Sequence, residues 1–287
     1  MNEITTSNAS HSPRNDTKRT YRPNSYRLKN KLSSRFTLHP SLKQKAAFTL
    51  SEVLITLGII GVVAAMTMPV LIQKNNERAW LTAFKKTYSV LSQAYMMAYE
   101  ERGVAREWGT SKTTEGCQKI YTIMSPYLKI SDNLGFKRPK GLKRDWRDLN
   151  GSTLGNGFFG TSTYNVVLSD GTLIAFNHDD ALHMPLLQVD INGVKGPNVM
   201  GKDMFYLALN DKNGYPVISG YAMWWIHNSV SCTIDKNASP GWRYGGGCST
   251  WIISTGNMDY LHRNLTLEEW QKAVSALLIK NGDVSLK

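Results

Sequence analysis

The chain has 287 residues, of which 41% are hydrophobic and 20% are charged, and this composition excludes wholesale disorder. Its formal net charge of +12 is compatible with binding to nucleic acid or to a membrane surface. Residues 1–47 contribute +8 of that charge, with ten basic residues against Glu3 and Asp16, so the rest of the chain is only mildly basic.

Residues 1–47 are rich in Ser, Asn, Thr, Arg and Lys and show no hydrophobic periodicity. A segment of this kind cannot bury enough apolar surface to offset the conformational entropy that is lost on ordering. We therefore predict that residues 1–47 form a basic, disordered leader that precedes the folded part of the protein.

An apolar segment follows the leader abruptly. Residues 48–72 read FTLSEVLITLGIIGVVAAMTMPVLI, and Glu52 is their single ionisable side chain. About 20 apolar residues in a helix span the hydrocarbon core of a bilayer, which is roughly 30 Å thick. Soluble helices are seldom apolar on every face, so a membrane span over about residues 50–72 fits better than a buried core helix.

The pattern then changes to that of an amphipathic helix over about residues 73–102. Large apolar and aromatic residues recur there at spacings of three and four. They are Trp80, Phe84, Tyr88, Leu91, Tyr95 and Tyr99. Gly103 ends the pattern and favours a helix stop. We predict one helix over residues 48–102, with a kink or a loosened turn at Pro69.

The remaining residues, 103–287, contain many turn-forming residues and are predicted to form one globular domain. We expect a loop region at about 103–160, followed by short antiparallel strands. The candidate strands include residues 164–168, 173–176, 204–209 and 251–254. Residues 265–280 have the pattern of an amphipathic helix, with Thr266 as its N-cap and Asn281-Gly282 as its stop. The predicted fold class is α+β, a long helix packed on a small antiparallel sheet with long loops.

The candidate sites in this domain are weakly marked. Three D-x-N-G tetrapeptides, at residues 148–151, 190–193 and 211–214, are typical of hairpin turns. Cys117, Cys232 and Cys248 form no metal-binding motif. Outside the cytoplasm, one disulfide plus one free thiol is the simple expectation, and free thiols throughout are the alternative. No P-loop, G-x-S-x-G, H-E-x-x-H or dinucleotide fingerprint occurs, so the case for an enzyme is weak.

The segment KAAFTLSEVLITLGIIGVVAA, residues 45–65, resembles the N-terminal signature of type IV prepilins and type II secretion pseudopilins. In that family a membrane peptidase cuts before a Phe and methylates it, and a Glu and a Pro follow at set positions. The resemblance implies cleavage between Ala47 and Phe48, methylation of Phe48, and assembly roles for Glu52 and Pro69. Two features differ: Ala47 stands where Gly is usual, and the leader is long, as a start codon assigned too far upstream would produce.

The resemblance implies a structural role as a major or minor subunit of a type IV pilus or a type II secretion-like pseudopilus. Such a protein has one span in the bacterial cytoplasmic (inner) membrane and a globular domain outside the cytoplasm until its helix enters the filament. The implied partners are the prepilin peptidase, other pilin or pseudopilin subunits and the inner-membrane assembly platform. No cofactor is required, and binding to nucleic acid is not expected.

Two further features are implied by the resemblance. Pilin-like domains often close a C-terminal loop with a disulfide, which here would join Cys232 and Cys248. Residues 190–203 look like the D-x-N-G…P-N-x-x-G-x-D loop of some pilin-like proteins, and similar loops in major pseudopilins bind calcium. Asp190, Asn192 and Asp203 would supply hard oxygen ligands, although the terminal Glu of an EF-hand is missing.

Glu52 is the residue whose chemistry bears most directly on function. A carboxylate in a membrane span is unfavourable unless it is paired. Cleavage would create an α-amine at Phe48 with which Glu52 of the same or a neighbouring subunit can pair; the alternative is a protonated, unpaired Glu52 near the membrane interface. Subunits that dock out of register would leave both charges unpaired, so we expect Glu52 to serve assembly rather than insertion.

Two other functions remain open at this point. One is a single-pass anchored binding module that never polymerises and needs neither processing at Phe48 nor Glu52. The other is a DNA-binding minor pilin for uptake, which would need a basic, aromatic face on its globular domain. Its binding would weaken steeply with salt, because each phosphate contact releases counterions.

Overall fold

The computed structural model describes residues 48–142, 146–153, 159–180, 183–212, 215–220, 230–238 and 245–280. The predicted leader, residues 1–47, therefore lies outside the described residues. Contacts within the chain separate two compact units, residues 1–54 and residues 55–287. Of the first unit, the described residues are 48–54, which contain the start of helix α1.

Helix α1 (Leu50–Arg102) is one continuous helix that includes Pro69. Its side chains are exposed almost throughout the apolar part, whereas a stripe that includes Phe84, Leu91 and Tyr95 is buried further along. The helix ends at Gly103, which has a φ of +73° and donates its N–H to the carbonyl of Tyr99 at 2.7 Å. A glycine in this left-handed conformation is a common helix terminator, because it carries no Cβ to clash.

Six strands form one antiparallel sheet, and each strand pairs with the next one along the chain. They are β1 (Ile130–Gly135), β2 (Tyr164–Leu168), β3 (Leu173–Asp179), β4 (Met184–Asp190), β5 (Met204–Lys212) and β6 (Tyr215–Gly220). The predicted strands at 164–168, 173–176 and 204–209 all fall within this sheet. The long connection between β4 and β5, residues 191–203, contains most of the loop discussed below.

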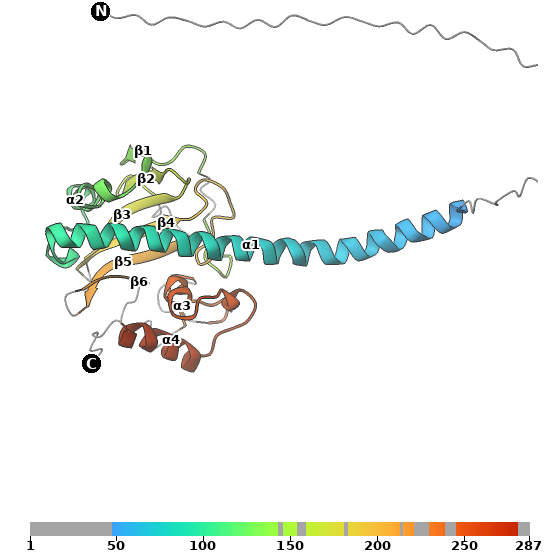
Figure 1. The fold of residues 1–287 in the computed structure, drawn as a ribbon. Helices are drawn as coiled ribbons and strands as arrows, with labels where there is room; N and C mark the ends of the chain where they lie inside the picture. The colour runs from blue at the N-terminus through green and yellow to red at the C-terminus, as the bar shows by residue number, and fades with distance from the viewer. Residues whose placement is uncertain are drawn as a thin grey trace, which may run out of the picture. The chain divides into compact units, whose positions relative to one another are not determined.

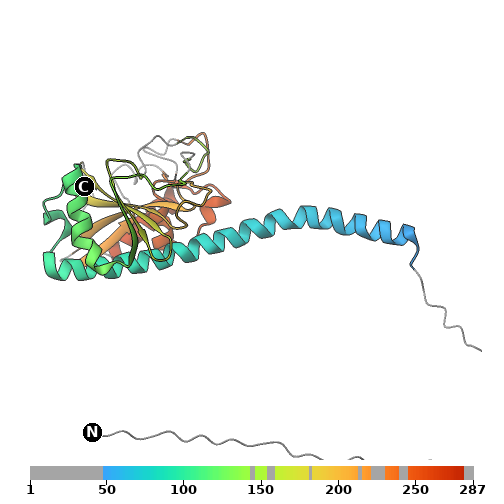
Figure 2. The same ribbon diagram turned by 90° about the horizontal axis from the view of Figure 1, so that it is seen from above.

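One face of the sheet packs against the second half of α1, which passes in front of the strands in Figure 1 and runs along one side of the sheet in Figure 2. Leu187 and Phe205 from the strands share a buried core with Phe84 and Leu91 from the helix. The rings of Phe84 and Phe205 meet edge to face with centroids 4.6 Å apart, a favourable geometry for an aromatic pair. The apolar stripe predicted from the sequence is thus the surface that attaches α1 to the sheet.

The opposite face of the sheet is covered by the segment between β1 and β2. Trp146 and Phe159 lie there with ring centroids 6.1 Å apart and form a second core with Leu186 and Tyr206 of the sheet. Both faces of the sheet are therefore buried, which explains why all seven residues of β4 are buried rather than every second one.

The predicted loop region at 103–160 is wrong in part, because it contains helix α2 (Thr114–Met124) and strand β1. Thr113 caps α2 by accepting the N–H of Gly116 at 3.0 Å. Ile120 and Met124 of α2 are fully buried in the core shared with α1 and the sheet. A helix this short gains most of its stability from such packing, so its local sequence signal is weak.

The strand predicted at residues 251–254 is also wrong, because these residues lie in helix α3 (Cys248–Thr255). A run of three apolar residues, here Trp251, Ile252 and Ile253, cannot distinguish a strand from a buried helical segment. Helix α4 (Leu267–Lys280) follows, and the rings of Trp251 and Trp270 stack between the two helices at 6.3 Å. The predicted cap of α4 is present, since Thr266 and Glu269 each accept the other's backbone N–H, at 3.2 and 2.9 Å.

These elements confirm the predicted fold class. A long, apolar N-terminal helix and a six-stranded antiparallel sheet form an α+β arrangement that is consistent with a pilin-like fold. Helix α3 lies beside β6 and α4 packs on α3 in Figure 1, and these two helices complete the described C-terminal part of the chain.

Candidate functional site

The first candidate site is the N-terminal segment of α1. Phe48, the residue predicted to follow the cut, is 84% exposed, and Ala47 lies outside the described residues. Glu52 reaches back over the helix start, where its carboxylate accepts the backbone N–H of Thr49 at 2.8 Å and the Thr49 hydroxyl at 2.9 Å. Thr49 in turn accepts the N–H of Glu52 at 3.2 Å, so the two residues form a capping box.

This capping box gives Glu52 hydrogen-bond partners within its own chain. Both donors belong to Thr49, so the Glu52 carboxylate is held at the helix start as a hydrogen-bond acceptor. A new α-amine at Phe48 would be four residues from it along the chain. The geometry therefore presents a carboxylate at the position where cleavage would create a positive charge.

The apolar surface that follows Glu52 is the second part of this site. Within the part of the chain that the structure describes, α1 is the one helix long and apolar enough to cross a membrane. The side chains of its most apolar window are not buried inside the protein. Pro69 lies in this exposed part, and the helix continues through it to Arg102.

The second candidate site is the loop at residues 190–203, which begins at the end of β4 and leads into β5. Asp190 and Asp203 are both fully buried, and Asn192 contacts both carboxyl groups. The backbone N–H of Asn192 lies 3.2 Å from Asp190 Oδ1, and its amide Nδ2 lies 3.2 Å from Asp203 Oδ2. The structure thus brings together the three residues that the sequence pattern marked as oxygen ligands.

Asp203 also organises the end of this loop. Its carboxylate accepts the N–H of Asn198 at 2.8 Å and that of Val199 at 2.7 Å. The loop turns through Gly193, which has a φ of +70° and donates its N–H to the carbonyl of Asp190 at 3.4 Å. The loop is therefore held in shape largely by hydrogen bonds to carboxylate and carbonyl oxygens.

Three oxygens in this loop are buried without a hydrogen-bond donor among the described residues: Asp190 Oδ2, Asn192 Oδ1 and Asn198 Oδ1. A buried polar atom without a partner is unfavourable and normally indicates a bound water or ion. Burial raises the pKa of Asp190 well above its ordinary value, and the charge of Asp203 raises that pKa further. Burial also raises the pKa of Asp203, against the opposing effect of its N–H donors. Two buried carboxyl groups and two buried amide oxygens thus lie in one hydrogen-bonded loop.

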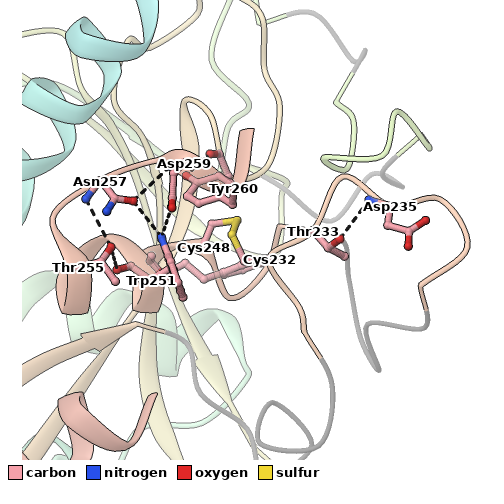
Figure 3. The surroundings of a disulfide bond; sticks show 12 residues. Cys232, Thr233, Asp235, Cys248, Trp251, Thr255, Asn257, Asp259 and Tyr260 are labelled. Atoms are coloured by element: carbon pink, nitrogen blue, oxygen red, sulfur yellow. Dashed lines mark hydrogen bonds between the residues drawn. A yellow bond between two sulfur atoms is a disulfide. The ribbon is translucent and has the colours of Figure 1, made fainter. Parts of the chain in front are cut away.

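A disulfide joins Cys232 to Cys248 at the start of α3, with the two Cα atoms 4.8 Å apart. Figure 3 shows the bridge beside Tyr260. The indole N–H of Trp251, also in α3, lies 2.8 Å from Asp259 Oδ1. Closing a loop of this length stabilises a fold by about 3 kcal/mol on the chain-entropy model. The bridge ties the segment before α3 to the rest of the domain.

Cys117 is fully buried in α2 and does not take part in the bridge. Its sulfur lies 3.6 Å from the carbonyl of Ser162 and 3.9 Å from Asn177 Oδ1. Burial raises the pKa of the Cys117 thiol to about 11, and the charge of Asp180 contributes in the same direction. A protonated, buried thiol is a poor nucleophile and a poor metal ligand.

Two residues of these sites were missed by sequence reasoning. Thr49 caps α1 together with Glu52, and the S/T-x-x-E spacing at the start of an apolar helix was the available signal. Asn198 adds a buried amide oxygen to the loop, and its place in the P-N pair of the loop motif was the corresponding signal. Among the described residues there is no group of three or more His, Cys, Asp or Glu side chains that could hold a metal ion. Any ligand set in the loop must therefore include amide or backbone oxygens.

Comparison with known protein families gives one match. The family model described as the prokaryotic N-terminal methylation motif matches residues 42–68, which include Phe48 and Glu52. Comparisons with curated proteins and with solved structures found no match. The chain therefore carries the prepilin-type cleavage and methylation signature. Together with the long apolar helix, this signature points to a membrane-anchored structural protein that a prepilin peptidase processes.

The burial of Cys117 leads to a direct chemical prediction. At pH 8 we expect Cys117 in the folded chain to react with iodoacetamide at least about a hundredfold more slowly than an exposed thiol, because both access and the thiolate fraction are low. The matched control is a cysteine introduced by Ser89→Cys on the exposed side of α1. Mass spectrometry of the alkylated peptides gives both rates, and equal rates would contradict the buried position.

Proposed function

We propose that this protein is a structural subunit, major or minor, of a type IV pilus or a type II secretion-like pseudopilus. The observation that carries the proposal is the methylation signature at residues 42–68 on the start of a helix whose apolar side chains are left exposed. After cleavage the signature would leave Phe48 as the first residue of that helix. The helix would hold the subunit in the inner membrane and later pack with its sister helices in the filament core.

The composition of the exposed part of α1 supports close packing between helices. Gly58 and Gly61 stand on it, and beyond the neighbouring residues and backbone of the helix itself nothing lies within 4 Å of the position that a Cβ would take. Small residues let helix backbones approach one another in an apolar medium, where van der Waals contact is a principal driving force. A second copy of the same helix is a suitable partner, because its surface is equally apolar.

The alternatives account for fewer of the observations. An anchored binding module that never polymerises would need an apolar span, but it would need neither a methylation signature nor a carboxylate within the span. A DNA-binding minor pilin would need a basic domain, yet most of the net charge lies in residues 1–47, which cleavage would remove.

Mass spectrometry of the mature N-terminus tests the processing step. We expect the membrane-bound protein from its native host to begin at Phe48 and to carry one methyl group on the α-amine. In a host strain that lacks the prepilin peptidase, the same protein should retain its leader. A chain that keeps residues 1–47 in the presence of the peptidase would overturn the proposal.

Substitution of Glu52 tests the assembly step. Removal of the Glu52 carboxylate would leave the α-amine of its partner unpaired in an apolar core. This destabilises the packed helices by about 3 kcal/mol or more. We therefore expect Glu52→Ala to be inserted and cleaved normally, while its incorporation into filaments falls by at least about tenfold. Fractionation of sheared filaments against membranes measures this ratio.

Two control variants separate pairing from other effects of that substitution. Glu100→Ala removes an exposed carboxylate elsewhere on α1 and should assemble normally. Thr49→Val removes the capping hydroxyl but keeps the carboxylate of Glu52, so it should retain most of the assembly. If Glu52→Ala enters filaments as well as these controls do, Glu52 is not needed for assembly.

We also propose that the loop at residues 190–203 binds calcium. Calcium prefers hard oxygen ligands, and the carboxylates of Asp190 and Asp203 with the amides of Asn192 and Asn198 provide them. The three buried oxygens that lack a donor among the described residues support this proposal, because a cation would give them a partner. A divalent charge would also offset the repulsion between two buried carboxylates.

Calcium should therefore stabilise the folded protein. With the full chain in detergent micelles, a concentration of 100 times Kd should add about 2.7 kcal/mol to the free energy of unfolding. Asp203→Asn and Asp190→Asn should each abolish this increase. Asp235→Asn, in the turn where the carboxylate of Asp235 accepts the N–H of Asn237 at 2.9 Å, is the matched control and should keep it. A thermal midpoint that calcium leaves unchanged in the unsubstituted protein would refute the calcium site.

A further inference from the structure

The loop at residues 190–203 lies directly against the disulfide. Gly201 has a φ of +82°, and a Cβ placed on it would lie 2.8 Å from Cys248 Sγ. A Cβ on Gly245 would lie 2.6 Å from the carbonyl oxygen of Met200. The backbone of the loop and the turn that precedes Cys248 therefore touch without side chains between them, so neither can shift without moving the other.

A buried hydrogen bond joins the loop to a third segment, the turn at Asp259–Leu261. The hydroxyl of Tyr260 donates to the carbonyl of Gly201 at 2.6 Å, and the Tyr260 side chain is fully buried. The ring of Tyr260 stands beside the bridge in Figure 3. The turn before Cys248 is anchored in turn to the residue preceding Cys232, because Gly245 donates its N–H to the carbonyl of Ser231 at 2.8 Å.

The connection to the candidate cation site is short. Asp203 accepts the N–H groups of Asn198 and Val199, and Gly201 donates its N–H to the carbonyl of Met204 at 2.8 Å. The same carboxylate that would bind a cation therefore sets the conformation of the backbone that packs on Cys248. A change at the cation site or at Cys248 therefore alters the order of the same stretch of loop backbone.

We propose that the Cys232–Cys248 disulfide and cation binding by residues 190–203 are thermodynamically coupled. The intact bridge holds the turn at 245–248 against Met200 and Gly201, so the loop is ordered before a cation binds. Reduction frees that turn, and the cation must then order the loop by itself, which lowers its affinity. By reciprocity, a bound cation makes the bridge harder to reduce by the same factor.

The redox step itself is ordinary dithiol exchange. A dithiol such as dithiothreitol breaks the Sγ–Sγ bond, two thiols form at Cys232 and Cys248, and the dithiol becomes its own cyclic disulfide. Through this one packed contact the domain would respond to two conditions, the oxidant supply and the divalent cation concentration. This coupling rests on the calcium site proposed above.

The test uses the full chain in detergent micelles, with Ca²⁺ as the probe. Isothermal titration compares Kd for the oxidised protein with Kd for the double variant Cys232→Ser, Cys248→Ser, and we expect an increase of at least about fivefold. The second measurement uses the unsubstituted chain in buffers of reduced and oxidised dithiothreitol, with alkylation and mass spectrometry to count the Cys232 and Cys248 thiols. Saturating Ca²⁺ should raise the ratio of reduced to oxidised dithiothreitol needed for half-reduction by the same factor.

Two further variants locate the coupling. Tyr260→Phe removes the hydroxyl that donates to the carbonyl of Gly201. It should reduce the shift that Ca²⁺ causes in the dithiothreitol ratio while keeping the disulfide. Asp203→Asn should remove the effect of Ca²⁺ on the redox equilibrium. The redox titration needs no cysteine substitution, so the proposal stays testable even if the double variant fails to fold.

The outcomes separate the two proposals. If the oxidised protein binds no Ca²⁺, the cation site and the coupling both fail. If Ca²⁺ binds with equal affinity in both redox states and leaves the redox equilibrium unchanged, the coupling is overturned and the cation site stands. A parallel shift in both measurements supports the coupling.

Discussion

The constraint on which the rest of the structure depends is that one helix meets two different surroundings. The first part of α1 exposes apolar side chains on every side, a surface that is stable only in lipid or against other apolar helices. The second part buries a single stripe, with Phe84 and Tyr95 in it, against a sheet. The hydrogen-bonded backbone of one helix joins these two parts, so a membrane span and a folded domain can share one element.

Because α1 covers one face of the sheet, other segments of the chain must cover the opposite face. The opposite face is apolar as well, and the segment that contains Trp146 and Phe159 covers it. Because both faces are buried, β4 has no solvent side, and polar residues within it, such as Gln188 and Asp190, are buried too. Buried polar groups need partners, which is why the end of β4 opens into a loop rich in hydrogen bonds.

The local predictions were correct where a signal is contained in a short stretch of sequence. The helix stop at Gly103 and the cap at Thr266 depend on neighbouring backbone groups, and both are present. The errors arose where packing decides. Helix α2 is short and stabilised by its contacts with the core, and residues 251–254 became part of α3 because Trp251 stacks on Trp270. The residues on which α2 and Trp251 pack lie elsewhere in the sequence, so the residues next to α2 or to Trp251 do not reveal them.

The sequence by itself determined the apolar span, the position of Glu52 in it and the methylation signature, because length, hydropathy and a contiguous motif are properties of one segment. Only the tertiary structure decided that Asn192 binds the buried carboxyl groups of both Asp190 and Asp203, and that the backbone at Gly201 lies against Cys248. Such contacts join segments far apart in the chain. They depend on how both cores are packed, and no local pattern encodes that arrangement.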